Sequence, residues 1–267
     1  MKKRFALGVI GGGFMAHAIV EGAIGNGFLH ADDIAVSEPN ASRAEDLREK
    51  GVYVCSDNRL VAENCEYLLF AVKPQIFSAV AEGLEQADLP VVISIMAGKT
   101  KKSVRAALGG KVRIARAMPN LPCSVGEGIA GIDTSELSEG EREFCFGLFA
   151  STGRAVETDE SLLNAVTALS GSGPAYVYLF LQSLIAAGRE QGLSEEQARE
   201  LAFQTVKGGV RMAELQPEKD LQKLIDAVSS KGGTTVAALE SFARDDFKGS
   251  VSRAVNAAAR RAEELSR

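Results

Sequence analysis

The stretch FALGVIGGGFMA, residues 5–16, decides the fold of the first half of this 267-residue chain. The apolar run Phe5–Ile10 predicts a buried strand, and helical spacing begins at Phe14. Between them, Gly11, Gly13 and Ala16 match the pattern G-x-G-x-x-G/A, which permits a tight turn and brings the backbone close to a pyrophosphate. Strand, glycine turn and helix in this order predict a dinucleotide-binding unit.

Alternating strands and helices continue from this unit to about Thr158. Strands are predicted over Phe5–Ile10, Ile34–Ser37, Tyr67–Val72, Val91–Ile95, Val112–Ala117 and, at the edge, Gly153–Thr158. Helices are predicted over Phe14–Gly25, Ala41–Lys50, Gln75–Glu85, Thr100–Leu108 and, after a capping box at Ser138 and Glu141, to about Phe149. The alternation predicts an α/β domain, residues 1–159, with a mostly parallel sheet.

From Glu160 onward the strand signals vanish. Helical spacing covers Leu162–Leu169, Pro174–Gln191, Ser194–Glu214, Lys219–Val228, Thr234–Arg244 and Phe247–Leu265. Residues 160–267 are therefore expected to form an all-α second domain. Its stretch Pro174–Gly188 is apolar on every side, which a small bundle cannot bury alone, so this domain is expected to form a homodimer.

Composition excludes several classes of protein. A formal net charge of -5 leaves no field that attracts nucleic acid. Two histidines and four cysteines without CxxC spacing give no metal site, and the cysteines are expected to be free thiols in the cytoplasm. The start MKKR with an apolar run resembles a signal peptide, but three glycines interrupt the run. No membrane span is expected, because Gly171–Pro174 cuts the longest uncharged stretch.

Three charged side chains near the predicted glycine turn have alternative roles. Glu38 ends the second strand, where a carboxylate accepts hydrogen bonds from ribose hydroxyls and repels a 2′-phosphate. Arg43 nearby could instead attract a 2′-phosphate. The alternative role of Glu38 is that of a solvated turn residue. Lys73, before Pro74, either contacts a cofactor or is solvated.

Two more glycine-rich segments precede helices in the second domain. Ser170–Tyr176 and Ser229–Thr235 both offer N–H groups and hydroxyls at a helix N-terminus, as a small carboxylate ligand requires. A ligand site is the favoured interpretation of each, because glycine pairs are costly to order, and a helix cap is the alternative.

Taken together, five motifs resemble pyrroline-5-carboxylate reductase along nearly the whole chain. They are GGGFMA, FAVKP, RAMPNLP (Arg116–Pro122), ALSGSGPAY (Ala168–Tyr176) and DAVSSKGGTT (Asp226–Thr235). The resemblance implies a Rossmann domain, an interlocked helical dimer that often assembles further, NADPH or NADH as cofactor, and the last step of proline synthesis.

The resemblance also assigns residues to the site. Cofactor contacts are expected at Gly11, Gly12, Gly13, Phe14, Met15, Ser37, Glu38, Asn58, Ala71, Val72, Lys73, Pro74, Met96, Ala97 and Gly98. Substrate contacts are expected at Ser230, Gly232, Gly233, Thr234 and Thr235, with Glu218 and Glu160 as weaker candidates. Lys231 departs from the family, which usually has proline there, so a rigid φ is lost and a charge is added.

A mechanism without histidine follows for a cyclic imine, which solvent can partly protonate. Thr235 would hydrogen-bond the imine nitrogen while the glycine loop holds the carboxylate, and the rate would come mainly from orientation. Two alternatives are a reductase of a related cyclic imine and a non-catalytic paralogue that binds NAD(P). A β-hydroxyacid dehydrogenase is disfavoured, because Pro174–Gly188 has no lysine.

Overall fold

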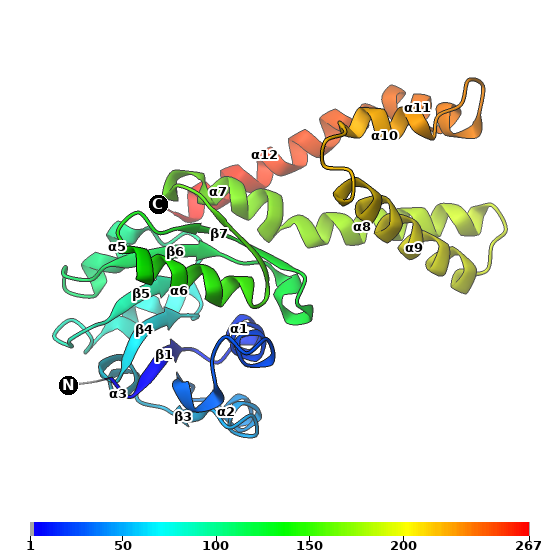
Figure 1. Ribbon diagram of the computed structural model, residues 1–267. Coiled ribbons are helices and arrows are strands. Elements are labelled where there is room, and N and C mark those ends of the chain that lie inside the picture. The colour runs from blue at the N-terminus through cyan, green and yellow to red at the C-terminus, as the bar shows by residue number, and fades with distance from the viewer. Residues whose placement is uncertain (1–2, 267) are drawn as a thin grey trace. The chain divides into compact units, whose positions relative to one another are not determined.

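The first part of the chain forms one eight-stranded sheet with helices on both faces in the computed structural model, which describes residues 3–266 (Figure 1). The strands are β1 (Phe5–Ile10), β2 (Ile34–Ser37), β3 (Tyr53–Cys55), β4 (Cys65–Phe70), β5 (Val91–Ser94), β6 (Ile114–Met118), β7 (Gly128–Asp133) and β8 (Gly153–Glu157). Their order is β3-β2-β1-β4-β5-β6-β7-β8, and every neighbouring pair is parallel except β6 with β7. The predicted mostly parallel α/β class is confirmed.

Two apolar cores cover the two faces of the sheet. The helices of this part are α1 (Phe14–Gly25), α2 (Ala41–Arg48), α3 (Asn58–Glu63), α4 (Phe77–Ala81), α5 (Lys101–Ala107), α6 (Glu139–Ala150) and α7 (Leu163–Val166). Val9, Leu69 and Ile93 lie in the core shared with α1 and α6, whereas their neighbours Phe70 and Val92 lie in the core shared with α3, α4 and α5. Because successive strand residues point to opposite faces, both faces of a strand must be apolar, which explains its continuous apolar sequence.

Several predicted bounds need correction. The strand predicted over Tyr67–Val72 is β4, two residues earlier, because Cys65 pairs with Phe5 at the start of β1. The helix predicted over Gln75–Glu85 is a 3₁₀ turn (Pro74–Ile76) followed by the short α4.

Strands β3 and β7 and helix α3 were not predicted. In β7 the reason is glycine, which weakens any strand signal. A Cβ on Gly128 would overlap Cys123, and one on Gly153 would overlap the backbone of Gly128. The glycines thus allow β7 and β8 to lie close to their neighbours.

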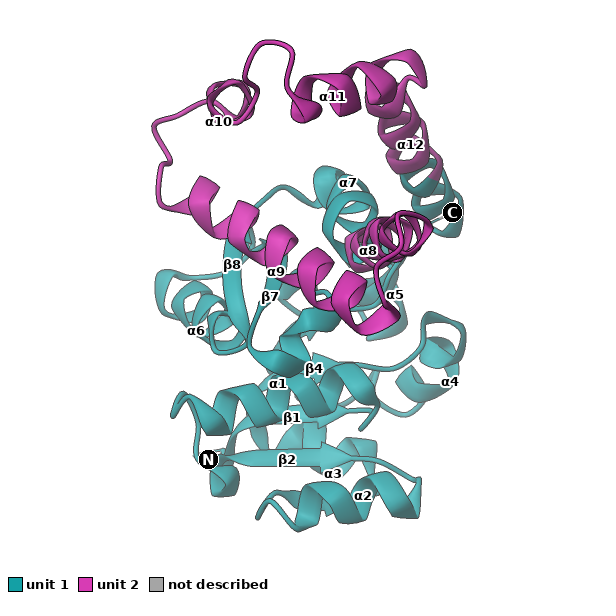
Figure 2. Cartoon of the chain, turned by 90° about the vertical axis from the view of Figure 1, so that its right-hand side faces the viewer, with its two compact units in different colours: residues 1–172, 258–267 teal, residues 173–257 magenta. Residues whose placement is uncertain are grey.

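The C-terminal part is helical, as predicted. It contains α8 (Gly173–Glu190), α9 (Glu195–Glu214), α10 (Leu221–Ala227), α11 (Thr234–Arg244) and α12 (Phe247–Leu265). Internal contacts divide the chain into two units, Met1–Ser172 with Ala258–Arg267, and Gly173–Ala257 (Figure 2). The last turns of α12 therefore belong with the sheet, whereas the sequence suggested a boundary at residue 160.

The segment Ser170–Tyr176 differs from its prediction. Thr167–Gly171 forms a π-helical turn, in which Ser172 N donates to Thr167 O at 2.8 Å, and α8 begins at Gly173. The predicted break is thus a widened helical turn. It is not a free helix N-terminus, because the preceding turn already accepts from the backbone of Ser172.

Helix α8 exposes a large apolar surface. Val177, Tyr178, Leu179 and Phe180 are 39% to 63% exposed, and Leu181 is the buried side chain of the helix. Even so, none of the helices within residues 3–266 combines the length and the apolarity that crossing a membrane requires. Exposed apolar patches of this kind mark interaction surfaces.

Candidate functional site

The loops that hold the predicted cofactor residues meet at the carboxyl edge of the sheet. From β1 the chain runs outward to β2 and β3 and then crosses back to β4 on the other side of β1. Open α/β sheets bind ligands at such a reversal of strand order, outside the carboxyl ends of the strands. The predicted cofactor residues lie at the carboxyl ends of β1 to β5, in the loops that follow these strands or in the first residues of the helices that the loops lead into.

The glycine turn after β1 has the shape that a pyrophosphate needs. Gly11 has a φ of 95°, and a Cβ there would lie 2.8 Å from Val72 Cγ1 and 3.1 Å from the carbonyl oxygen of Ala71. At Gly13, in contrast, a Cβ would meet nothing within 4 Å, and no side chain in the described range caps α1. Open space beside uncapped N–H groups fits the phosphates of a dinucleotide.

Glu38 is buried against this turn. Its Oε2 accepts from Gly12 N at 2.7 Å and its Oε1 accepts from Asn40 N at 2.8 Å, while a guanidinium nitrogen of Arg43 lies 3.8 Å from Oε2. An ionised carboxylate has about four acceptor positions, so two backbone donors leave room for ribose hydroxyls. The structure thus brings Glu38 and the glycine turn together.

Ser37 and Asn58 join the same cluster. Ser37 Oγ donates to Asn58 Oδ1 at 2.6 Å, and the Ser37 carbonyl accepts from Gly11 N at 2.9 Å. Asn58 is the first residue of α3, so the unpredicted β3 and α3 are what place it beside β2.

The remaining cofactor candidates flank β4 and β5. Lys73 is exposed and precedes Pro74, which is the first residue of the 3₁₀ turn as predicted. Met96 is 3% exposed and lies in the core, so only its backbone can reach a ligand. Gly98 has a φ of 75°, which other residues rarely adopt.

The second glycine loop is a β-turn that leads into α11. Gly233 N donates to Ser230 O at 2.9 Å, and Gly232, at the third position of the turn, has a φ of 72°, as in a type II turn. Gly233 is the N-cap of α11 and provides no side-chain cap. The first turn of α11 thus presents free N–H groups together with the hydroxyls of Thr234 and Thr235.

Glu218 and Glu160 lie in different surroundings. Glu218 is exposed in the turn before α10. Glu160 accepts from Lys101 N at 2.6 Å and forms an ion pair with Arg116 at 3.3 Å. Its role as a substrate contact remains a prediction.

Three buried charges near Glu160 were not recognised from sequence. Arg116, Lys101 and Asp133 are 4% to 6% exposed, and Lys101 Nζ lies 2.5 Å from Asp133 Oδ1. Burial lowers the pKa of Arg116, and the nearby carboxylate of Glu160 offsets part of this shift. Burial would raise the pKa of Asp133, but hydrogen bonds from Lys101 and Ser135 outweigh it, so this pKa lies below its ordinary value. For Arg116 the available signal was a charged residue inside a predicted apolar strand, whereas Lys101 lies in a helix and Asp133 in the unpredicted β7.

Comparison with known proteins agrees with this geometry. Residues 6–98 match the family described as NADP oxidoreductase coenzyme F420-dependent, and residues 160–265 match the family described as pyrroline-5-carboxylate reductase dimerisation. The chain is 38% identical to pyrroline-5-carboxylate reductase of Synechocystis over 262 residues, 97% of each chain.

Solved structures extend the comparison to three dimensions. A pyrroline-5-carboxylate reductase of Coxiella burnetii is 33% identical with a TM-score of 0.90, and the match covers 100% of both chains. The enzyme of Plasmodium falciparum, solved with NADP bound, is 30% identical with a TM-score of 0.86, again over 100% of both chains. On these full-length matches, the chain belongs to the pyrroline-5-carboxylate reductase family.

Proposed function

We propose that this protein transfers a hydride from NADPH or NADH to the C=N bond of 1-pyrroline-5-carboxylate and releases L-proline. One observation carries the proposal: the first turn of α11 is uncapped and bears Thr234 and Thr235, so it offers donors for both a carboxylate and an imine nitrogen. The glycine turn after β1, with its open space at Gly13, supports dinucleotide binding in the same chain.

The chain's own contribution to the reaction is binding and orientation. N–H groups of Gly232, Thr234 and Thr235 hold the substrate carboxylate, and the hydroxyl of Thr235 donates a hydrogen bond to the imine nitrogen, whose proton solvent supplies. The reduced nicotinamide, when bound, supplies the hydride. Because no side chain need transfer a proton, the absence of histidine from residues 31–267 of the sequence is consistent with the mechanism.

A direct assay tests the proposal. Purified protein is mixed with 1-pyrroline-5-carboxylate and either reduced cofactor, and nicotinamide absorbance and proline are followed. We expect absorbance to fall and proline to appear in equal amounts. A folded protein that binds the cofactor but does not reduce 1-pyrroline-5-carboxylate with NADPH or with NADH would be the non-catalytic paralogue. Faster turnover of a different cyclic imine would identify a related reductase.

Replacing Glu38 should change the choice of cofactor. A carboxylate and a 2′-phosphate about 4 Å apart repel by up to about 4 kcal/mol at an effective dielectric near 20, and solvent and Arg43 reduce this. We expect Glu38→Ser to shift the ratio of kcat/KM for NADPH over NADH upward by about tenfold.

The ratio isolates the effect of the 2′-phosphate, because both cofactors share the glycine turn that Glu38 also contacts. Arg43→Gln is the matched control and should move the ratio toward NADH. An unchanged ratio in Glu38→Ser would show that Glu38 does not face the ribose.

Lys231→Pro should stabilise the substrate loop. Lys231 occupies the second position of the type II turn, where proline fits, and its N–H donates no backbone hydrogen bond within residues 3–266. We expect the free energy of unfolding to rise by about 0.4 to 1 kcal/mol in urea denaturation, because the unfolded chain loses freedom. Lys231→Ala, which removes the charge alone, is the control. A proline variant less stable than the alanine variant would contradict the turn type.

The helical part should form an obligate homodimer. The exposed apolar residues of α8 need a partner, and the matched dimerisation family covers 160–265. We expect light scattering at micromolar concentration to give at least twice the chain mass of 28.2 kDa, with an interface above about 2,000 Å². An active monomer would disprove this. Assembly of dimers into larger particles is a further proposal, which the same measurement tests.

Two further assignments complete the proposal. We divide the chain by function at residues 1–159, for dinucleotide binding, and 160–267, for dimerisation and substrate. We place the protein in a reducing cytoplasm, which fits its four free cysteines. Burial raises the pKa of two of them, Cys65 and Cys145, to about 12. Nucleic-acid and membrane partners are not part of the proposal.

A further inference from the structure

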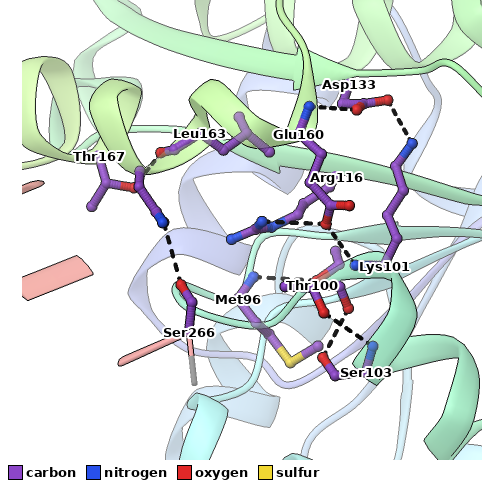
Figure 3. Close-up of polar contacts among 12 residues, drawn as sticks. Met96, Thr100, Lys101, Ser103, Arg116, Asp133, Glu160, Leu163, Thr167 and Ser266 are labelled. Atoms are coloured by element: carbon purple, nitrogen blue, oxygen red, sulfur yellow. Dashed lines mark hydrogen bonds and ion pairs between the residues drawn. The ribbon is translucent and has the colours of Figure 1, made fainter. Parts of the chain in front are cut away.

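The loop between β5 and α5, residues 95–100, is held at one end by Glu160. The carboxylate of Glu160 accepts from Lys101 N, the first N–H of α5, at 2.6 Å (Figure 3). This bond crosses 59 residues of sequence. Because a helix has no internal acceptor for its first N–H groups, Glu160 fixes the point at which the loop enters α5.

Glu160 is itself held in place. Arg116 on β6, 7% exposed at its side chain, pairs with Glu160 Oε1, and the backbone N of Glu160 donates to Asp133 Oδ2 at 2.6 Å. The other oxygen of Asp133 receives Lys101 Nζ. Both the N–H and the carboxylate of Glu160 are thus fixed by buried charged partners, which gives the carboxylate little freedom to turn away.

A second contact on this loop comes from the end of α12. A Cβ on Gly98 would lie 2.6 Å from the carbonyl oxygen of Leu265 and 2.9 Å from its carbonyl carbon, so two backbones meet here with no room for a side chain. Ser266 Oγ lies 3.3 Å from Asn164 Oδ1 and 2.8 Å from Ala262 O, which fastens this last turn of the chain.

We propose that Glu160 and Leu265 are positioning residues for the nicotinamide end of the cofactor. The inference rests on the proposed function. A dinucleotide bound with its pyrophosphate at the first βα turn would place its adenosine half along β1–β3 and its nicotinamide half at the loops after β4 and β5. Glu160 and Leu265 begin and end the segment that matches the dimerisation family. Both ends of that segment thereby set the shape of one cofactor loop.

Binding of a whole and of a half cofactor tests this assignment. The variants are a chain that ends at Glu264 and Glu160→Ala, with Glu160→Gln, which keeps an acceptor for Lys101 N, as the conservative rescue. Glu264→Gln, an exposed change that removes the surface ion pair with Arg261, is the matched control. We expect the Kd of NADPH to rise about tenfold in the shortened chain and in Glu160→Ala, and the Kd of 2′-phospho-ADP-ribose, which lacks nicotinamide, to stay within about twofold.

An equal rise in the Kd of both ligands, or no rise in either, would overturn the assignment. The shortened chain keeps the test valid if Glu160→Ala does not fold because Arg116 is left unpaired. These binding measurements need no imine turnover, so a failure of the proposed reaction would be seen separately in the unmodified enzyme.

A double-mutant cycle tests the backbone contact. Gly98→Ala should raise the Kd of NADPH more in the full-length protein than in the chain ending at Glu264, because the added methyl group then no longer meets Leu265. Contacting residues give non-additive effects, whereas independent ones add. Equal effects in the two backgrounds would show that Leu265 does not hold the loop.

Discussion

Thr235→Ala should lower kcat for the imine by about 30- to 1,000-fold, which corresponds to about 2 to 4 kcal/mol, while the Kd of NADPH stays within about twofold. Thr235 is the second residue of α11, directly after Gly233 and Thr234, and its side chain is half-buried. A threonine on a helix has few side-chain rotamers, so its hydroxyl points in few directions. Losing it removes a hydrogen bond donated to the imine nitrogen, which strengthens as hydride addition to the carbon moves an electron pair onto that nitrogen.

Thr235→Ser is the matched control, because it keeps the hydroxyl and removes only a methyl group. Single-turnover kinetics with saturating cofactor would separate hydride transfer from product release. Thermal unfolding of both variants checks that the folded fraction is equal. If kcat of Thr235→Ala lies within about twofold of the parent, the hydroxyl does not act on the imine.

The parts of the fold that sequence predicted well are those with strong local signals. β1, α1, α11 and α12 have the predicted bounds. In β1 and α1 a continuous apolar run, three glycines and a helical period agree, so each supports the others. α12 has a strongly amphipathic sequence, and its period alone determines its length.

The parts that sequence missed depend on distant partners. Glu160 meets Lys101 across 59 residues, and Lys101 meets Asp133 across 32. Sequence spacing carries no sign of such pairs, and charged side chains are expected at the surface. The strand β7 was hidden for a related reason, since its glycines serve close backbone approach and not strand propensity.

Lys101→Met should destabilise the protein by about 3 to 5 kcal/mol, because it leaves the Asp133 carboxylate buried without its ammonium partner. Both side chains are about 5% exposed, so water cannot replace the lost charge. Methionine has nearly the length of lysine and limits the cavity. Urea unfolding at one fixed protein concentration measures the loss.

The pH dependence of this variant should have the opposite sign to that of the parent. In the parent the folded-state pKa of Asp133 lies below its unfolded value near 3.9, so the stabilisation from this group is present above about pH 4 and is lost as the pH falls further. Without Lys101, burial dominates and raises the pKa of Asp133, so the folded state prefers the protonated acid. Lowering the pH from 7 to 5 should therefore increase the stability of Lys101→Met relative to the parent. Lys101→Met combined with Asp133→Asn should abolish that difference, and its persistence in the double variant would assign the titration to another group.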